Sequence, residues 1–415
     1  MVPARDLITL NYGRALKADT RSSGKVPVFG TNGRCGWHDK PLSKGPGLIL
    51  GRKGQGPLGV EWCDQDFWVI DTAYYASTLT HDLDLKYLYY LVKHVGLNHL
   101  KDGTSNPTLA RDTFGAQLLP LPPLAEQRAI AAVLGALDDK IELNRRMNVT
   151  LEAMARALYQ SWFVDFDPVR AKLDGRCLAA VDIATAALFP TTFQDSPLGH
   201  IPRGWETGSI LWQADLLSGG TPKTDVPDYW NGDIPWASAR DVSQCGEAFL
   251  VSTERGITKQ GVNESSTKIV PDLATVVVAR GATTGRLTMV AHAMAMNQTC
   301  YGLRSKVGAP FALYCNARHF IERLVQGGHG SIFDTITTST FEATQVLLAP
   351  KEVLRAFDKQ VAPLFQQIRA NLYQSSTLAT LRDTLLPKLL SGELSVAGLN
   401  NPEFPEGSSR RGLTT

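Results

Sequence analysis

The chain has 415 residues, of which 43% are hydrophobic and 20% are charged, and its formal net charge is +2. This length allows two or more cores, and the composition is ordinary for a globular protein. The small net charge excludes a uniformly basic surface, so any surface that binds a polyanion must be a local patch. No run approaches 18 apolar residues and residues 1–5 lack an apolar signal core, so we predict a cytoplasmic protein without a membrane partner.

Residues 1–120 are predicted to form a mixed α/β domain. Short strand-like runs at 26–29, 47–50 and 67–70 are separated by Gly-rich turns. The apolar pattern at 83–91 then predicts a helix.

A single long helix with one apolar seam is predicted from Leu121 to Phe163. Alternating steps of four and three residues from Ile130 meet an apolar residue or Ala at eight of ten positions, a 3.5-residue period that is typical of a coiled coil. Pro122 and Pro123 supply the start signal. The ten seam positions are Ile130, Leu134, Leu137, Ile141, Asn144, Asn148, Leu151, Ala155, Leu158 and Trp162.

The same seam returns 227 residues later in the chain. Asn144 and Asn371 occupy the same step, and a polar residue in a seam can fix its register at a cost in stability. Periodicity alone leaves open two unrelated amphipathic helices, whereas the shared offset favours an internal repeat. The second set of positions is Phe357, Val361, Leu364, Ile368, Asn371, Ser375, Leu378, Arg382, Leu385 and Leu389.

The offset of 227 also holds outside the helices, which indicates a duplication of the whole half. Near the N-terminus it drops to 209 where Asp6-Leu7 matches Asp215-Leu216, and to 208 where Val26-Pro27 matches Ile234-Pro235. The second half therefore carries about 18 extra residues, which we place between Asp241 and Asp272. The other matches are Gly54 with Gly281, Thr72 with Thr299, Tyr74 with Tyr301, Gly103 with Gly330, Thr108 with Thr335, Phe114 with Phe341 and Pro123 with Pro350.

These patterns predict an α+β protein with two mixed α/β domains, two long antiparallel helices that separate them, and an internal pseudo-twofold repeat. Pro363 is expected to kink the second helix or to mark its true start. The predicted segments are the first domain (1–120), the first helix (121–165), a connector (166–194), the second domain (195–349), the second helix (350–394) and a disordered tail (395–415).

Four motifs resemble those of the specificity (S) subunits of type I DNA restriction-modification systems. The resemblance spans nearly the whole chain, but the first half lacks the Leu-Gly-x-Ile-Pro-x-Gly-Trp segment that opens the second. How the N-terminus closes against the C-terminal tail is therefore left open. The motifs are Leu121-Pro-Pro-Leu-Ala-Glu-Gln127, Ser161-Trp-Phe-Val-Asp-Phe-Asp-Pro168, Leu198-Gly-His-Ile-Pro-Arg-Gly-Trp205 and Leu385-Leu-Pro-Lys-Leu-Leu-Ser-Gly-Glu-Leu394.

The resemblance implies that each domain is a target-recognition domain for one part of a split DNA sequence, and that the helices act as spacers. It implies double-stranded DNA, two methyltransferase (M) subunits and restriction (R) subunits as partners. It also implies no cofactor in this chain, with S-adenosylmethionine, ATP and Mg²⁺ on the partner subunits. Two alternatives remain: a self-contained DNA-modifying enzyme, and a scaffold that joins two protein-binding domains.

If DNA is the ligand, each domain needs cations for phosphates and side chains that reach base edges. The Gly-rich loop at 51–56 offers two cations and a glutamine, and its counterpart at 279–286 offers arginines and threonines. Either loop taken alone is also compatible with a solvated turn. We predict DNA contacts by Arg34, Arg52, Lys53, Gln55, Lys101, Arg240, Arg280, Thr283, Thr284, Arg286 and His329.

No catalytic or metal site is predicted. Neither Gly-rich loop fits a phosphate-binding or dinucleotide fingerprint, and the Asn401-Pro-Glu-Phe404 segment departs from the adenine methyltransferase motif at its third position. Three histidines, His292, His319 and His329, lack a partner at catalytic spacing, so we expect structural rather than catalytic roles for them, apart from the DNA contact predicted for His329. The cysteines show no C-x-x-C and no regular spacing, which predicts reduced thiols without zinc or disulfides. They are Cys35, Cys63, Cys177, Cys245, Cys300 and Cys315.

Overall fold

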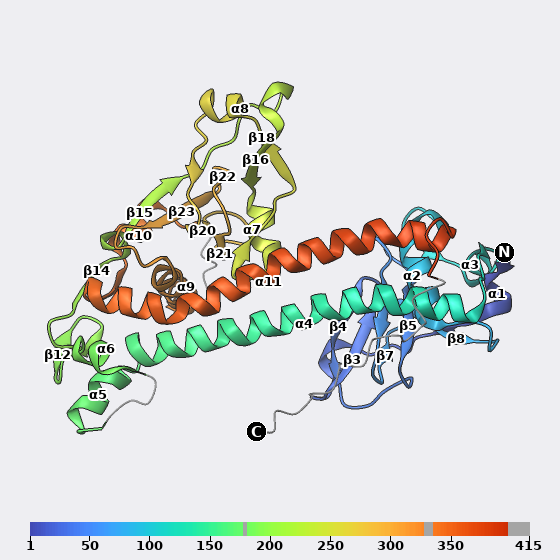
Figure 1. Ribbon diagram of the computed structural model, residues 1–415, viewed down its shortest axis with the longest axis horizontal. Helices are drawn as coiled ribbons and strands as arrows, with labels where there is room; N and C mark the ends of the chain where they lie inside the picture. The colour runs from blue at the N-terminus through green and yellow to red at the C-terminus, as the bar shows by residue number, and fades with distance from the viewer. Residues whose placement is uncertain (177–180, 328–334, 397–415) are drawn as a thin grey trace, which may run out of the picture. The chain divides into compact units, whose positions relative to one another are not determined.

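The protein forms two compact units, seen in a computed structural model (Figure 1). Unit 1 contains Met1–Ile141 and the segment that starts at Thr377, and unit 2 contains Glu142–Ser376. The two long helices each contribute a segment to each unit, so the domain boundaries given above stay predictions. The structure describes residues 1–176, 181–327 and 335–396.

Unit 1 is built on a four-stranded sheet with the order β2-β8-β5-β6 and a three-stranded sheet with the order β4-β3-β7. The pairs are antiparallel except for β3 and β7, which are parallel. Leu48, Ile49 and Leu50 are fully buried, so β5 is covered on both faces. The strands are β2 (Ile8–Tyr12), β3 (Val26–Gly30), β4 (Gly33–His38), β5 (Gly47–Gly51), β6 (Val60–Cys63), β7 (Trp68–Val69) and β8 (Ala73–Thr78).

Shorter elements complete unit 1. The predicted helix near residues 83–91 is α2, which runs from Leu85 to Val95 and packs Tyr87, Leu88 and Tyr90 into the core. The others are β1 (Val2–Pro3), α1 (Ala4–Leu7), η1 (Ala18–Thr20), η2 (Asn98–Leu100), β9 (Lys101–Asp102), β10 (Thr108–Leu109), α3 (Arg111–Gly115) and β11 (Leu118–Leu119).

Unit 2 has a five-stranded sheet with the order β15-β23-β20-β21-β17 and a four-stranded sheet with the order β18-β16-β22-β19. As in unit 1, one pair in the smaller sheet is parallel, between β16 and β22. The strands are β15 (Ala214–Ser218), β16 (Trp230–Ala237), β17 (Phe249–Leu250), β18 (Arg255–Ile257), β19 (Ile269–Val270), β20 (Thr275–Val278), β21 (Leu287–Val290), β22 (Met294–Met296) and β23 (Cys300–Ser305).

The remaining elements of unit 2 surround these sheets. The motif Leu198 to Trp205, which has no counterpart in the first half, forms β13 of a hairpin and buries Trp205. The elements are α5 (Asp167–Leu173), α6 (Ile183–Ala187), β12 (Phe193–Ser196), β13 (Gly199–Pro202), β14 (Glu206–Ser209), η3 (Ile210–Trp212), η4 (Pro227–Tyr229), α7 (Ala239–Cys245), α8 (Lys259–Asn263), α9 (Pro310–Gly327), α10 (Thr338–Ala343) and β24 (Gln345–Leu348).

Strand registers confirm the internal repeat and correct its alignment near the N-terminus. Tyr12 lies opposite Tyr74, and Ser218 lies opposite Tyr301, the counterpart of Tyr74. The offset is therefore 206 for this first strand, and the predicted match of Asp6-Leu7 with Asp215-Leu216 is wrong. A shared Asp-Leu pair misled the alignment because it lies in α1 in one half and in β15 in the other.

The extra residues of the second half lie after β16. Val28 pairs with Trp68 and Trp236 pairs with Ala295, which confirms the predicted match around Val26-Pro27 with an offset of 208. At β5 and its counterpart β20 the offset is 227. The second half therefore has 19 extra residues between β16 and β20. They include α7 and β17, which joins the larger sheet as its outermost strand.

Both long helices are continuous. The first, α4, runs from Leu124 to Phe163, and the second, α11, runs from Lys351 to Ser391. Of the two outcomes predicted for Pro363, a kink or the true start of the second helix, the start is wrong, because α11 begins at Lys351, more than three turns earlier and directly after Pro350.

The seam residues face the neighbouring helix segment within each unit. Seven of the fourteen principal seam positions are buried and seven are half-buried, as expected for a narrow stripe. The buried ones are Ile130, Leu134, Asn144, Phe357, Val361, Ile368 and Asn371. The half-buried ones are Leu137, Ile141, Leu151, Leu158, Leu364, Leu378 and Leu385.

The seam asparagines of unit 2 bond to each other across the helix pair. Asn371 donates to the Asn148 side chain (2.9 Å), and Asn144 donates to the Ser375 hydroxyl (3.2 Å). Ser375 is the counterpart of Asn148, so each contact maps onto the other when the halves are exchanged. This is the local signature of a pseudo-twofold relation between the helices.

One seam layer is not equivalent in the two units. In unit 1, Arg382 donates to Asp138 (2.6 Å), which also accepts from the Tyr90 hydroxyl (2.9 Å). The counterparts of Asp138 and Arg382 in unit 2 are Phe365 and Ala155, both fully buried. A charged layer in one unit thus replaces an apolar layer in the other.

In each unit, a side chain of a long helix binds the N-terminus of the helix that follows the larger sheet, which is α2 in unit 1 and α9 in unit 2. In unit 1, the buried Gln127 accepts from the backbone of Asp84 (2.9 Å) and donates to Asp82 (2.8 Å). In unit 2, Asp358 accepts from the backbone N–H groups of Phe311 (2.7 Å) and Ala312 (3.0 Å). These hydrogen bonds explain why the Leu-Ala-Glu-Gln motif ends in glutamine.

Asp358 should make the stability of unit 2 depend on pH. Burial raises the pKa of this carboxyl to about 6, although the two N–H donors favour its charged form. Because the folded-state pKa lies above the unfolded value of about 4, the Asp358 contribution to stability is lost as pH rises from about 4 to about 6. We expect Asp358→Asn to raise the Tm relative to the wild type at pH 7 and to lose this advantage near pH 4. The exposed Asp272→Asn variant is the control, and an identical pH profile for both variants would contradict the assignment.

Candidate nucleic-acid interface

The Gly-rich loop of unit 1, residues 51–56, is fixed by backbone contacts on both sides. The N–H of Arg52 donates to Thr72 (2.9 Å), and the Arg52 carbonyl accepts from Leu109 (2.7 Å). Lys53 forms an isolated bridge with Thr108. A Cβ at Gly51 would lie 2.3 Å from the Thr31 carbonyl oxygen, so glycine is required by this close approach.

The loop of unit 2 has the same backbone contacts at an offset of 227. Ala279 donates to Thr299 (2.8 Å) and accepts from Ile336 (2.8 Å). Arg280 bridges to Thr335, the counterpart of the contact between Lys53 and Thr108. The two loops are therefore structural equivalents.

Two residues predicted to contact DNA in unit 1, Gln55 and Lys101, connect the Gly-rich loop to the neighbouring loop at residues 101–107. The Gln55 amide donates to the carbonyls of Thr104 (3.1 Å) and Ser105 (2.8 Å), and the Lys101 ammonium donates to the carbonyl of Gly56 (3.0 Å). These bonds tie residues 51–56 to residues 101–107. The sequence did not predict this positioning role.

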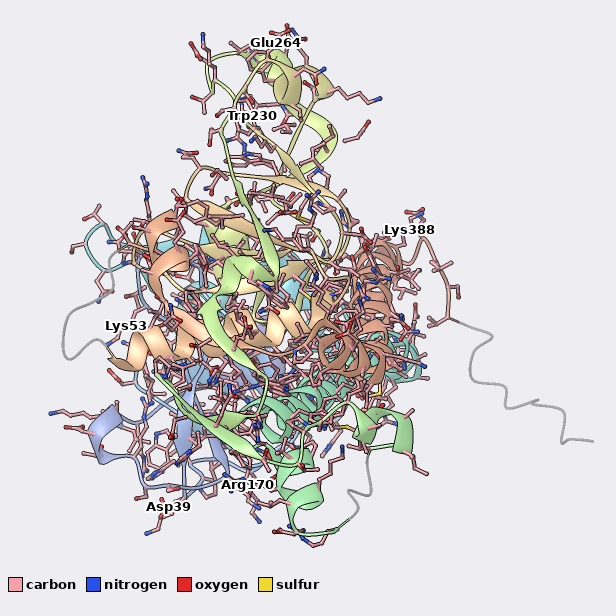
Figure 2. All side chains as sticks on the ribbon, turned by 90° about the vertical axis from the view of Figure 1, so that its left-hand side faces the viewer. Asp39, Lys53, Arg170, Trp230, Glu264 and Lys388 are labelled. Atoms are coloured by element: carbon pink, nitrogen blue, oxygen red, sulfur yellow. The ribbon has the colours of Figure 1, made fainter. Side chains whose placement is uncertain are left out.

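The two cations of the unit 1 loop share one acidic partner. Lys53 (Figure 2) pairs with the Asp71 carboxylate (3.1 Å), and Arg52 donates to the Asp71 carbonyl (2.9 Å). The side chains of Lys53 and Asp71 are 29% and 49% exposed, so this ion pair adds little stability and leaves the ammonium accessible. Arg34 lies elsewhere, on β4, with its guanidinium 4.8 Å from the centre of the Trp37 ring.

The predicted contacts of unit 2 gather around α7 and the Gly-rich loop. Thr283 accepts from the Ser243 hydroxyl (2.7 Å), and Thr284 donates to the Gly281 carbonyl (2.7 Å). Arg280 and Arg286 are exposed and form no ion pair with any residue that the structure describes. Arg240, also predicted to contact DNA, is 3.5 Å from Glu254 in an exposed ion pair. The last predicted residue, His329, lies outside the described residues.

Tyr12 and Arg111 were missed from the sequence. The Tyr12 ring centre lies 4.8 Å from the Arg52 guanidinium and 4.5 Å from the Arg111 guanidinium. The sequence gives no signal for Arg111, because the bond between Leu109 and Arg52 that brings it to the Gly-rich loop becomes visible only in the structure.

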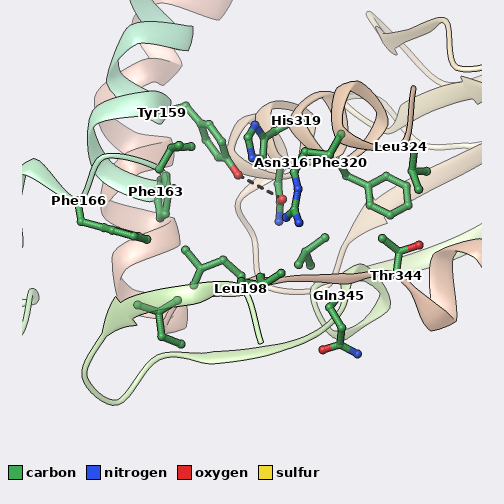
Figure 3. A pocket seen from close by; sticks show the side chains of 15 residues that line it. Tyr159, Phe163, Phe166, Leu198, Asn316, His319, Phe320, Leu324, Thr344 and Gln345 are labelled. Atoms are coloured by element: carbon green, nitrogen blue, oxygen red, sulfur yellow. Dashed lines mark hydrogen bonds between the residues drawn. The ribbon is translucent and has the colours of Figure 1, made fainter. Parts of the chain in front are cut away.

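A cavity of about 490 Å³ lies between the C-terminal end of α4, the helix α9 and the strand β24 (Figure 3). The Tyr159 hydroxyl donates to Asn316 (3.2 Å) at its wall, and burial lowers the pKa of His319 beside them. No Asp, Glu, Ser or Cys is among the described residues that line it. Thr344 carries the aliphatic hydroxyl among the described lining residues, and no carboxylate there can orient His319 as a base.

The described part of the chain also contains no metal-binding cluster, no disulfide and no helix able to cross a membrane. No group of three or more His, Cys, Asp or Glu side chains there is arranged to hold a metal ion. The five described cysteines are free, and burial raises the pKa of Cys300 to about 12. His292 bonds to Tyr373 (3.0 Å). Among the described helices, none combines the length and the apolar character needed to cross a membrane. Cys177 and the segment from Asn401 to Phe404 lie outside the described residues.

Comparison with known proteins agrees with this geometry. The family described as "Type I restriction modification DNA specificity domain" matches residues 1–153 and 202–374. The type I restriction enzyme HindI specificity subunit of Haemophilus influenzae is 28% identical over 333 residues, covering 69% of this chain and 71% of that protein. The MjaIX specificity subunit of Methanocaldococcus jannaschii is 25% identical, covering 76% and 70%.

A solved structure shows the same fold. The crystal structure of the type I restriction-modification S subunit from M. genitalium matches with a TM-score of 0.58 at 16% sequence identity, covering 93% of this chain and 94% of that chain. The family match extends over both halves of the repeat, including both Gly-rich loops. The chain belongs to the family of type I restriction-modification DNA specificity subunits.

Proposed function

We propose that the chain is a non-catalytic subunit that reads a bipartite, asymmetric DNA sequence for a type I restriction-modification complex. The observation that carries this proposal is the pair of equivalent Gly-rich loops. They hold the same backbone position but present different side chains, since Arg52, Lys53 and Gln55 correspond to Ala279, Arg280 and Ala282. Two reading surfaces imply two half-sites, and unlike side chains imply unlike sequences.

The surface of unit 2 offers the two kinds of contact that DNA recognition needs, and the surface of unit 1 offers a cation. The exposed Arg280 and Arg286 can neutralise phosphates, while Thr283 and Thr284 can bond to base edges. Lys53 supplies a partly exposed cation at the equivalent place in unit 1. These contacts are local patches, as the small net charge requires.

The long helices supply the surface for protein partners in this proposal. On α4, Leu143, Val149 and Met154 are 50%, 58% and 50% exposed, although they are apolar. Contiguous exposed apolar side chains mark a docking surface, and Leu143 and Met154, which are eleven residues apart, lie on the same face of the helix. We infer that two methyltransferase subunits bind along the helices and that restriction subunits join the full complex. S-adenosylmethionine, ATP and Mg²⁺ would then be bound by those partners.

The test is selection from a random DNA pool by the chain together with its methyltransferase subunit. We expect two short conserved blocks of different sequence, separated by positions of fixed number and free identity. Enrichment of one contiguous block, or no enrichment, would contradict the proposal. Methylation by the purified chain alone would favour a self-contained enzyme instead.

A further inference from the structure

The Tyr12 ring lies close to two guanidinium groups at the surface of unit 1. The Cζ atoms of Arg52 and Arg111 are 4.8 Å and 4.5 Å from the ring centre. Tyr12 itself is 47% exposed, and its ring packs against Tyr74 at 5.2 Å. The cluster therefore presents an aromatic edge and two cations next to the Gly-rich loop.

The positive charge of this cluster is not balanced by the residues around it. Arg52, Lys53 and Arg111 bring three positive charges, and among the described residues the carboxylate that pairs with them is that of Asp71, which contacts Lys53. The Arg111 side chain forms no ion pair or hydrogen bond with any residue in the described ranges. The Arg52 Nε atom is buried and has no hydrogen-bond partner among the described residues. Two like charges on one ring repel each other, and an anion bound beside them would remove that cost.

The fold does not need the cluster, as the repeat demonstrates. Strand register and backbone bonds make Ser218 the counterpart of Tyr12, Ala279 that of Arg52, and Thr338 that of Arg111. Unit 2 thus lacks all three side chains, although it keeps the buried partners of this region, such as Phe341 for Phe114. A set of residues that is specific to one unit and dispensable for the fold points to a ligand of that unit.

The geometry favours a phosphate over a base edge. Reading guanine takes a free guanidinium fork, and the Arg52 fork is held by its Nη1 bond to Asp71 (2.9 Å). Arg111 has free donors, and its stacking on Tyr12 limits the motion of the side chain. A phosphate needs only charge and a few donors in a fixed place.

We propose that Tyr12, Arg52 and Arg111 form a site for one backbone phosphate of the DNA half-site that unit 1 binds. Arg111 contacts the phosphate, and Tyr12 and Arg52 are positioning residues. The proposal rests on the DNA-reading function proposed above. It adds a contact that fixes the register of unit 1 on the duplex and that unit 2 does not share.

The experiment compares Arg111→Ala with the wild-type full chain, each in complex with the methyltransferase subunit. Dissociation constants are measured over a range of salt concentrations, on the selected target and on targets altered in one half-site. For Arg111→Ala we expect binding about 10-fold weaker on every DNA, and a slope of log affinity against log salt that is shallower by about 1. Arg111→Lys should recover part of the affinity and all of the slope, because it restores the charge.

Thr338→Ala, at the equivalent position of unit 2, is the matched control and should bind like the wild type. Tyr12→Ala should weaken binding with an unchanged salt slope, whereas Tyr12→Phe should bind normally. A wild-type affinity and slope for Arg111→Ala would overturn the phosphate site while leaving the reading function intact. Relaxed preference at one base pair would overturn it too, since Arg111 would then contact a base. Failure of the wild-type complex to prefer its target would instead overturn the proposed function.

Discussion

Residues 1–170, expressed without the rest of the chain, should form a homodimer that selects a palindromic DNA sequence. This fragment contains all of α4 and therefore a complete copy of the seam. In the intact chain Asn371 bonds to Asn148, and Asn371 is the counterpart of Asn144. A second copy of α4 can thus provide the same contact, from Asn144 of one copy to Asn148 of the other. Two identical reading surfaces related by a twofold axis read an inverted repeat.

The layer of the seam that contains Asp138 and Arg382 determines the expected affinity of this dimer. In the fragment, Ala155 of the second copy takes the place of Arg382, so Asp138 keeps Tyr90 as a donor but loses its ion pair. Removing one partner of a half-buried charge pair is costly, so the dimer should be weaker than the link within the intact chain. Ala155→Arg in the fragment should restore the pair in both halves and lower the dimer dissociation constant.

The same substitution gives a control in the intact chain. There Ala155 is fully buried in the aromatic core of unit 2, so Ala155→Arg should lower the Tm. Analytical ultracentrifugation measures the dimer, and selection from a random pool with the methyltransferase subunit measures the target. A monomeric fragment, or a dimer that selects an asymmetric site, would contradict the twofold account.

Trp162→Ala is expected to lower the free energy of unfolding of unit 2 by about 3–5 kcal/mol. Trp162 is 1% exposed, and its ring centre lies 5.6 Å from Phe357 and 5.1 Å from Phe189. The Ser-Trp-Phe-Val-Asp-Phe-Asp-Pro motif therefore closes α4 with an aromatic cluster, and Ser161 donates to Asp167 to fix the following turn (2.7 Å). Deleting the indole leaves a cavity that rigid rings cannot fill.

Denaturant unfolding followed by intrinsic fluorescence and circular dichroism measures this loss. Met154→Ala on the same helix is the control, because Met154 is 50% exposed and should change stability by less than about 0.5 kcal/mol. Equal effects of the two substitutions would show that the aromatic cluster does not stabilise unit 2.

The repeat and the helix seam could be predicted because they depend on patterns that survive in the sequence. Burial selects apolar residues at fixed steps, and the shared asparagines mark the register of both copies. The alignment failed where such constraints were absent, as at Asp6, since two residues of sequence identity weigh less than five paired positions of a strand. Pro363 misled for another reason: a proline removes one backbone donor, and the packed seam around Val361 and Phe365 outweighs this loss.

The candidate site was harder to predict because its parts meet only through the fold. Gln55 and Lys101 bond to carbonyls of loops about 50 residues away, and a backbone acceptor leaves no trace in residue identity. Tyr12 and Arg111 lie 99 residues apart and meet through the pairing of β2 with β8 and the contact of Leu109 with the Gly-rich loop. The equivalence of the two loops was predictable, whereas the side chains that surround each were not.

The most direct test of the two-reader account is one selection experiment on three proteins: the wild type, Lys53→Ala and Arg280→Ala, each with the methyltransferase subunit. Lys53 and Arg280 occupy equivalent positions in units 1 and 2. We expect each substitution to weaken binding or to relax base preference in one half-site only, by about 1–3 kcal/mol where a base contact is lost, and in opposite halves for the two variants. Altered preference in the same half for both variants, or in both halves for either one, would contradict the assignment of one half-site to each unit.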